Sequence, residues 1–168
     1  MVKLTVIYGE GRGKTSLSIG YGYLQEAEKK KVTVVQFLKT GNNCGECYFF
    51  KNYDNIRWFC FGREGFFTGE NKKEYINIIE KGFQNLFESL KDNPTDLLLL
   101  DELGMALEFE LVNFNKIKEL FSFVNEEIIV TGRNVPLAVR EKAHKIIKIE
   151  EKKHPYNQGI TARKGIDF

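Results

Sequence analysis

Long apolar runs, cysteines and an excess of charge of one sign are all scarce in this chain of 168 residues. No uncharged stretch is long enough to span a bilayer, and the opening MVKLTVI is interrupted too early to act as a secretory signal. With 25 Lys and Arg against 23 Asp and Glu, the net charge is only +2. We therefore expect a cytoplasmic protein with neither a nucleic-acid nor a membrane partner.

The three cysteines and two histidines are also too few for several kinds of site. Three is an odd number in a chain with no evident export signal, so reduced thiols are predicted rather than a disulfide framework. Cys44 and Cys47 have the spacing of half a zinc site or of a redox pair, but no second pair completes a tetrahedral set. We interpret this spacing as a coincidence, and Cys60, inside an apolar stretch, as a small core residue.

What the chain does contain is a regular alternation of strand-like and helix-like stretches. Apolar and β-branched runs predict strands at 3–8, 32–38, 57–61, 96–102, 127–133 and 145–149. Apolar residues at three- and four-residue spacings predict helices at 15–29, 71–90, 113–124 and 136–143. No linker or repeat interrupts the pattern, so one domain over 1–168 is expected. The alternation predicts an α/β fold, with a mostly parallel sheet and helices on both faces.

The stretch YGEGRGKTS, residues 8–16, lies between the first predicted strand and the first predicted helix. In a phosphate-binding loop, backbone N–H groups surround the phosphates, while a lysine and a hydroxyl contact phosphate oxygens and a magnesium ion. Gly13, Lys14 and Thr15 fit these last positions. Tyr8 stands where the common pattern has its first glycine, so a tighter loop is expected. The motif predicts a nucleotide site formed by Gly9, Glu10, Gly11, Arg12, Gly13, Lys14 and Thr15.

Charged residues follow three other predicted strands. Asp101 and Glu102 end the run DLLLLDE, where one carboxylate could hold magnesium near the Thr15 hydroxyl. Lys39 follows VVQFL, and Arg133 follows EIIVTG. The ends of parallel strands meet at one edge of a sheet, where both cations could neutralise phosphate. A helix N-cap for the acids and an exposed turn for Arg133 are the alternatives.

The stretch FGREGFF, residues 61–67, places Phe66 and Phe67 after a glycine in a predicted loop. Large aromatic side chains in loops often face a flat ligand, but they can equally well cover a core. The residues by themselves therefore indicate a magnesium-nucleotide enzyme with an aromatic second site. They do not identify the second substrate.

Taken together, the motifs are similar to those of the P-loop ATP:corrinoid adenosyltransferases. The resemblance rests on GEGRGKT, VVQFLKTG, the GFF loop, LLLLDEL, IIVTGR and the tail KHPYNQGITARKGIDF, in that order over nearly the whole chain. Tyr8 then resembles the first position of that family's own loop variant. The fold expected is an α/β P-loop domain of the RecA-like type.

The resemblance implies that the cobalt of a cob(I) corrinoid attacks the 5′ carbon of ATP. Triphosphate then leaves, and adenosylcobalamin or its precursor forms. A cobalt(I) nucleophile needs no general base, so catalysis would come from positioning and leaving-group stabilisation. Lys14, Thr15 and Glu102 would be the catalytic residues, with magnesium near Thr15, Asp101 and Glu102, and the nucleotide would lie reversed in the loop.

The resemblance also implies a corrinoid site and two protein partners. Phe66, with Phe67 beside it, would displace the lower axial ligand of the corrinoid, which makes the cobalt easier to reduce. Relatives often have a tryptophan two residues after this phenylalanine, where this chain has Thr68. A homodimer and a reduced flavoprotein as electron donor are further implications.

Two other interpretations use the same motifs. A nucleoside kinase of the thymidine-kinase type also joins a P-loop to a DE strand, but it carries zinc-binding CxxC pairs, and this chain has a single CxxC. A RecA-like ATPase module would use the aromatic loop to stack on bases, but no basic stripe accompanies that loop. The released product would distinguish the three.

Overall fold

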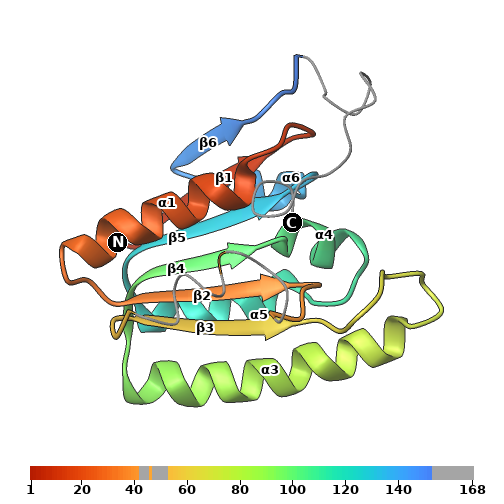
Figure 1. Cartoon of the computed structure of the whole chain (residues 1–168), viewed down its shortest axis with the longest axis horizontal. Helices are drawn as coiled ribbons and strands as arrows, with labels where there is room; N and C mark the ends of the chain where they lie inside the picture. Colours follow the sequence, from red (N-terminus) through yellow and green to blue (C-terminus); the bar gives the residue numbers. More distant parts are fainter. Residues whose placement is uncertain (42–45, 47–52, 153–168) are drawn as a thin grey trace.

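The computed structural model describes residues 1–41, 46 and 53–152. Within this part of the chain, six strands form one sheet in the order β3-β2-β4-β5-β1-β6 (Figure 1). Every pairing between neighbouring strands is parallel, which confirms the predicted α/β class. The strands are β1 Lys3–Tyr8, β2 Val32–Phe37, β3 Ile56–Phe61, β4 Thr95–Asp101, β5 Val124–Gly132 and β6 Lys145–Lys148.

Helices cover both faces of this sheet, as predicted. The buried residues form two clusters, one with side chains of α3 to α6 and one that packs against Tyr21 of α1. None of the helices in the described ranges is both long and apolar enough to cross a membrane. The helices are α1 Lys14–Ala27, α3 Lys72–Asp92, α4 Leu103–Glu108, α5 Phe114–Glu119 and α6 Leu137–Arg140, with a 3-10 turn at Leu120–Phe123.

The central strand β4 shows why its sequence is a continuous apolar run. Leu98 and Leu100 point into the larger cluster, on the side of α3. Leu97 and Leu99 point into the smaller cluster, on the side of α1. All four are at most 2% exposed, because successive side chains of a strand alternate between two covered faces.

The main departure from the predicted elements lies between β4 and β5. The predicted helix over 113–124 is too long, because α5 ends at Glu119 and a 3-10 turn connects it to β5 at Val124. The helix α4 was not predicted at all. Its six residues directly follow the strand and are too few to show a helical period.

Gly104 of α4 packs closely against Gly132 at the end of β5. A Cβ added at Gly104 would lie 2.3 Å from the carbonyl oxygen of Asn134 and 2.9 Å from Val135 Cγ2. We expect Gly104→Ala to lower the free energy of unfolding by roughly 1–3 kcal/mol, because backbone must move to admit the methyl group.

Gly20→Ala in α1 is the matched control, since an added Cβ there meets nothing within 4 Å. This control should leave stability unchanged or raise it by up to about 1 kcal/mol. Urea unfolding of both variants measures the difference. Equal stability of Gly104→Ala and the wild type would contradict the packing of α4.

Candidate functional site

The phosphate-binding motif lies where β1 ends and α1 begins. Gly9 and Gly13 have positive φ angles of 119° and 95°, which glycine adopts without strain. Added Cβ atoms would lie 2.3 Å from Ile149 O at Gly9 and 2.7 Å from Ile149 Cγ2 at Gly11. The glycines of the loop therefore allow the chain to turn, and they also leave room for the segment after β6 to approach closely.

Two backbone amides tie this loop to the neighbouring strands. Gly9 N donates to Arg133 O at 3.0 Å, and Gly11 N donates to Ile149 O at 3.0 Å. The two acceptors directly follow β5 and β6, the strands on either side of β1. An anion in the loop would then be bound mainly by Lys14 and by the first turn of α1, whose amides have no partner within the helix.

The tyrosine at the first position of the motif packs against α6. The guanidinium carbon of Arg140 lies 4.9 Å from the centre of the Tyr8 ring, and Arg140 Nη1 donates to the Tyr8 hydroxyl at 3.3 Å. This is the geometry of a cation–π contact. Arg140 is 132 residues away along the chain, so the sequence alone could not pair it with the loop.

Lys14 is the buried cation of the loop, with 8% of its surface exposed. Its Nζ donates to the carbonyl oxygen of Gly11 at 2.6 Å. Burial lowers the pKa of Lys14, and the nearby carboxylates of Glu102 and Glu10 act in the opposite direction. A phosphate at this position would supply the desolvated ammonium with a counter-charge.

Asp101 is fully buried at the end of β4 and accepts four side-chain hydrogen bonds. Oδ1 accepts from the hydroxyls of Thr15 and Thr131, each at 2.8 Å. Oδ2 accepts from Gln36 Nε2 at 3.1 Å and from Lys39 Nζ at 2.9 Å. Three residues predicted from separate motifs, Thr15, Lys39 and Asp101, are therefore in direct contact.

The Asp101 carboxylate also governs the protonation of its charged neighbours. Burial acts to lower the pKa of Lys39, but the charge and hydrogen bond of Asp101 outweigh it, so this pKa is raised. The pKa of Glu102 is raised by burial and then by the negative charge of Asp101. A cation placed near Glu102 would offset both causes.

The backbone turns sharply at Glu102, the first residue after β4. Its φ of 59° is in the left-handed region, which is uncommon for a residue with a side chain. It occupies the N-cap of α4, but its side chain caps no amide of that helix. The N-cap alternative therefore does not describe Glu102, and its carboxyl group is left to the site.

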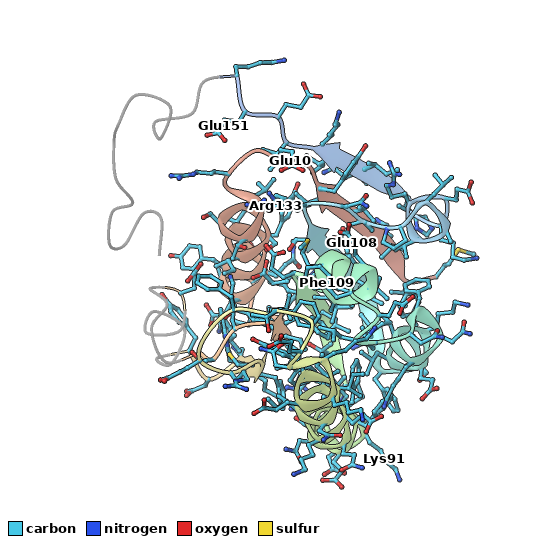
Figure 2. All side chains as sticks on the ribbon, turned by 90° about the vertical axis from the view of Figure 1, so that its right-hand side faces the viewer. Glu10, Lys91, Glu108, Phe109, Arg133 and Glu151 are labelled. Carbon is cyan, nitrogen blue, oxygen red and sulfur yellow. The ribbon has the colours of Figure 1, made fainter. Side chains whose placement is uncertain are left out.

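Arg133 lies at the carboxyl edge of the sheet, as predicted. In Figure 2, where this edge faces the viewer, Glu10 and Arg133 are labelled beside each other. Arg133 Nη1 is 3.9 Å from Glu10 Oε2, and the two side chains are 67% and 79% exposed. Exposed pairs of this kind are weak, so either side chain can turn towards a bound phosphate or metal at little cost.

The two phenylalanines of the GFF stretch have different environments. Phe66 is 92% exposed. Phe67 stacks on Phe109 with ring centres 4.4 Å apart and planes 19° apart, and it also meets the edge of Tyr75. Phe109 follows α4 and is labelled in Figure 2. Phe67 thus covers the core, and Phe66 is exposed to solvent.

Hydrogen bonds to the start of α3 hold this loop in place. Asn71 Nδ2 donates to Phe66 O at 3.0 Å, and Asn71 Oδ1 accepts from Thr68 N at 3.2 Å. The Tyr75 hydroxyl donates to Gly65 O at 3.3 Å. The backbone on both sides of Phe66 is therefore tied to α3 while its ring remains outside the core.

Two residues of the site were missed by sequence reasoning, Gln36 and Thr131. Both are fully buried and bonded to Asp101. The signal available was a single polar side chain near the end of an apolar strand, in VVQFL and in IIVTG. Such residues are buried at a cost unless they have partners, which makes them candidates for a site.

The cysteines add little to this site. Cys44 and Cys47 lie outside the described residues. Cys60 is a free, half-buried thiol that accepts from Trp58 Nε1 at 3.2 Å, and burial raises its pKa. Across the described ranges, no group of three or more His, Cys, Asp or Glu side chains is arranged to hold a metal. The prediction of Cys60 as a small core residue holds only in part, because the thiol is half-buried and belongs to neither of the two core clusters.

The ends of β1, β2, β4 and β5 thus bring a phosphate-binding loop, two cations and an acidic pair to one edge of the sheet. The arrowheads in Figure 1 mark this edge. Oxygen donors from Thr15 and Glu102, beside the buried Asp101, suit magnesium, and Lys14 and Lys39 suit phosphate. These donors suit a nucleotide with its phosphates, and no histidine lies among those residues of the site that the structure describes.

Comparisons with known proteins agree with this site. Residues 2–168 match the family described as ATP:corrinoid adenosyltransferase BtuR/CobO/CobP. A corrinoid adenosyltransferase of Sinorhizobium sp is 28% identical over 168 residues, which cover 95% of this chain and 77% of that protein. One of Pseudomonas aeruginosa is 28% identical, with coverage of 98% and 83%. Another, from Escherichia coli K12, is 25% identical, with coverage of 98% and 85%.

Proposed function

This chain belongs to the ATP:corrinoid adenosyltransferase family, and from that premise we propose how its residues perform the reaction. The reaction is the transfer of the 5′-deoxyadenosyl group of ATP to the cobalt of a reduced corrinoid, with release of triphosphate. The observation that carries the assignment to residues is the contact of Thr15 and Lys39 with the buried Asp101, directly beside the phosphate-binding loop.

The triphosphate of ATP would lie over the loop and the first turn of α1. Lys14 would exchange its bond to Gly11 O for a phosphate oxygen, and the α1 amides would bind others. Lys39 and Arg133 approach the same edge from β2 and β5. Lys14 is already held within the loop and Lys39 is held by Asp101, so these two donors would stabilise negative charge on the leaving triphosphate with little reorganisation, whereas Arg133 would turn towards it.

The residues around Thr15 fit a magnesium ion. Thr15 and Glu102 offer the hydroxyl and carboxylate oxygens that magnesium prefers, and Asp101, which already accepts four hydrogen bonds, would act on the ion through Thr15 or a water molecule. The Thr15 hydroxyl donates its single hydrogen bond to Asp101, so its lone pairs remain for a cation. A magnesium ion bound there would neutralise part of the charge that develops on the triphosphate.

The bond made is cobalt to carbon, and the bond broken is the C5′–O bond to the triphosphate. The electron pair of cobalt(I) forms the new bond, and the pair of the broken bond leaves with the triphosphate oxygen. No proton has to be removed from the nucleophile. The task of the protein is therefore to hold C5′ in line with the cobalt and to bind the leaving group.

The exposure of Phe66 is the observation that supports a corrinoid site next to the nucleotide. Its ring is 92% exposed on a loop whose backbone is tied to α3 by Asn71. We infer that Phe66 takes the place of the lower axial ligand of the corrinoid, and that Phe67 only supports the loop from the core. Thr68 stands where relatives often have a tryptophan, so the contact would rest on one aromatic ring.

Four further features of this proposal come from the family and from the sequence. The working form would be a homodimer in which residues 1–168 act as one domain. A reduced flavoprotein would supply the electron that converts cobalt(II) to cobalt(I). A cytoplasmic location, with no nucleic-acid partner, remains a prediction from composition. The acceptor would be cobalamin or one of its corrinoid precursors.

The nucleoside kinase and the RecA-like ATPase are not favoured. The family match covers residues 2–168, including the GFF loop and the tail motif, and the curated relatives are adenosyltransferases. These interpretations still differ from the transferase in their products, which gives a direct test.

The test is an anaerobic incubation of the protein with ATP, magnesium and chemically reduced cob(I)alamin. We expect a photolabile alkyl-cobalt spectrum and one triphosphate for each adenosylcobalamin formed. Parallel reactions without ATP, and with cob(III)alamin without reductant, should give neither product. Release of ADP or orthophosphate without an alkyl-cobalt product, with a smaller corrinoid also tried, would contradict the proposed function.

A further inference from the structure

We propose that Gln36 and Thr131 are positioning residues that clamp the two oxygens of Asp101 and so fix the Thr15 hydroxyl for the magnesium nucleotide. The inference rests on the proposed function, because it concerns the same site. It adds two residues that do not themselves touch the substrate.

The clamp comes from the two strands that flank β4. In the sheet, β2 and β5 lie on either side of β4. Gln36 of β2 is in register with Asp101. On the other side, Leu100 is in register with Val130, so Thr131 follows beside Asp101. The sheet itself therefore places an amide and a hydroxyl on opposite sides of the same carboxylate.

Each flanking side chain takes one oxygen. Gln36 Nε2 donates to Oδ2 of Asp101 at 3.1 Å, and Thr131 Oγ1 donates to Oδ1 at 2.8 Å. All three residues are fully buried. Because a buried polar group without a partner is costly, rotation of the Asp101 carboxylate would break both bonds at once. Asp101 is thus held in one orientation before any ligand arrives.

This orientation determines what Thr15 can do. A carboxylate has about four acceptor sites, and Asp101 uses four with Thr15, Thr131, Gln36 and Lys39. The Thr15 hydroxyl has one proton and points it at Oδ1. Its lone pairs are then directed away from Asp101 and remain available to a cation. The clamp therefore acts on the cation through Thr15.

Thr131 also fixes the neighbouring acid. Its hydroxyl oxygen accepts from the backbone N–H of Glu102 at 2.9 Å while its proton goes to Asp101. Glu102 is the residue with the left-handed φ of 59°. One threonine therefore links the Asp101 carboxylate, the Thr15 hydroxyl and the backbone of Glu102 in a single chain of hydrogen bonds.

The test compares Thr131→Val with a matched variant elsewhere in the sheet. Thr33 of β2 is also fully buried, and its hydroxyl bonds to Thr95 Oγ1 at 3.1 Å, distant from Asp101 along the strand. Thr33→Val therefore removes a buried hydroxyl of the same kind without touching the clamp. Thr131→Ser keeps the hydroxyl and should restore the wild-type behaviour.

The measurement is the affinity for Mn²⁺ as a magnesium probe, titrated by electron paramagnetic resonance in the presence of ATP. We expect Thr131→Val to weaken Mn²⁺ binding by about tenfold or more, as is usual when a group that orients a metal ligand is lost. ATP affinity without metal, measured by calorimetry, should change less than about twofold, because Lys14 and the α1 amides are untouched. Thr33→Val should shift the urea midpoint comparably but leave Mn²⁺ binding unchanged.

Gln36→Met provides a second variant if Thr131→Val does not fold, and the same loss of Mn²⁺ affinity is expected from it. Equal Mn²⁺ affinities for Thr131→Val and Thr33→Val, or no recovery with Thr131→Ser, would overturn the clamp while leaving the proposed function intact. A wild-type protein that binds Mn²⁺ no better with ATP than without it would overturn both.

Discussion

Lys14→Ala is expected to lower kcat/KM for triphosphate release by about 10²–10³-fold, the usual loss when one donor to developing negative charge is removed. The Lys14 ammonium is 8% exposed and already lies within the loop, on the carbonyl oxygen of Gly11. Alanine has no donor to replace it, and the loop backbone cannot supply a full positive charge. Initial rates of triphosphate release in the anaerobic assay, measured at a fixed protein concentration over a range of ATP concentrations, give the value.

The control for this variant is Lys91→Ala. Lys91 lies in the last turn of α3, at the opposite end of the sheet from the loop, and is labelled in Figure 2. Its removal should leave turnover unchanged. Urea unfolding should show Lys14→Ala to be as stable as the wild type, because burial already disfavours the charged lysine. A kcat/KM of Lys14→Ala that is about 10% of the wild-type value or more would contradict the role of Lys14 on the leaving group.

Phe66→Ala is expected to separate the two oxidation states of the corrinoid substrate. Turnover that starts from cob(II)alamin should fall by about tenfold or more, which corresponds to the loss of an aromatic contact of about 1.4 kcal/mol. Turnover of chemically reduced cob(I)alamin should fall much less. The reason is that Phe66 acts before reduction, by displacing the lower axial ligand, whereas cobalt(I) no longer holds that ligand.

Two comparisons make this prediction specific. Leu24→Ala removes another exposed apolar side chain, 62% exposed on α1, and should affect neither rate. Phe67→Ala should lower stability instead, since it removes the ring stacked on Phe109. The measurements are initial rates from each oxidation state with the same reductant present. Equal losses from cob(II)alamin and cob(I)alamin in Phe66→Ala would contradict the displacement of the lower ligand.

The order of the motifs could be read from the sequence because each one is local. The loop GEGRGKT, the acids after LLLLD and the arginine after IIVTG all follow predicted strands, and parallel strands present such ends at one edge. Helix α3 was predicted to within two residues at each end, from 71–90 to Lys72–Asp92, because its apolar spacing is long and regular. The family resemblance used the same local signals and was confirmed by the match over residues 2–168.

Other features depended on contacts between distant segments, for which the sequence has no local signal. Phe66 and Phe67 have different environments because Phe67 stacks on Phe109, which directly follows α4, a helix too short to show a period. A tyrosine fits at position 8 because its ring packs against Arg140. The loop needs glycines because Ile149, after β6, lies directly against it. In each case the partner is fixed only when the sheet assembles.

By itself, then, the sequence determined the α/β class, the phosphate-binding loop and the set of charged residues at the strand ends, because periodicity and motif spacing act over short distances. Only the tertiary structure decided how those charges are connected. Asp101 gains Gln36 and Thr131 as partners because β2 and β5 flank β4, and strand order is a property of the whole sheet. Local motifs supply the chemical groups of the site, and long-range packing sets their geometry.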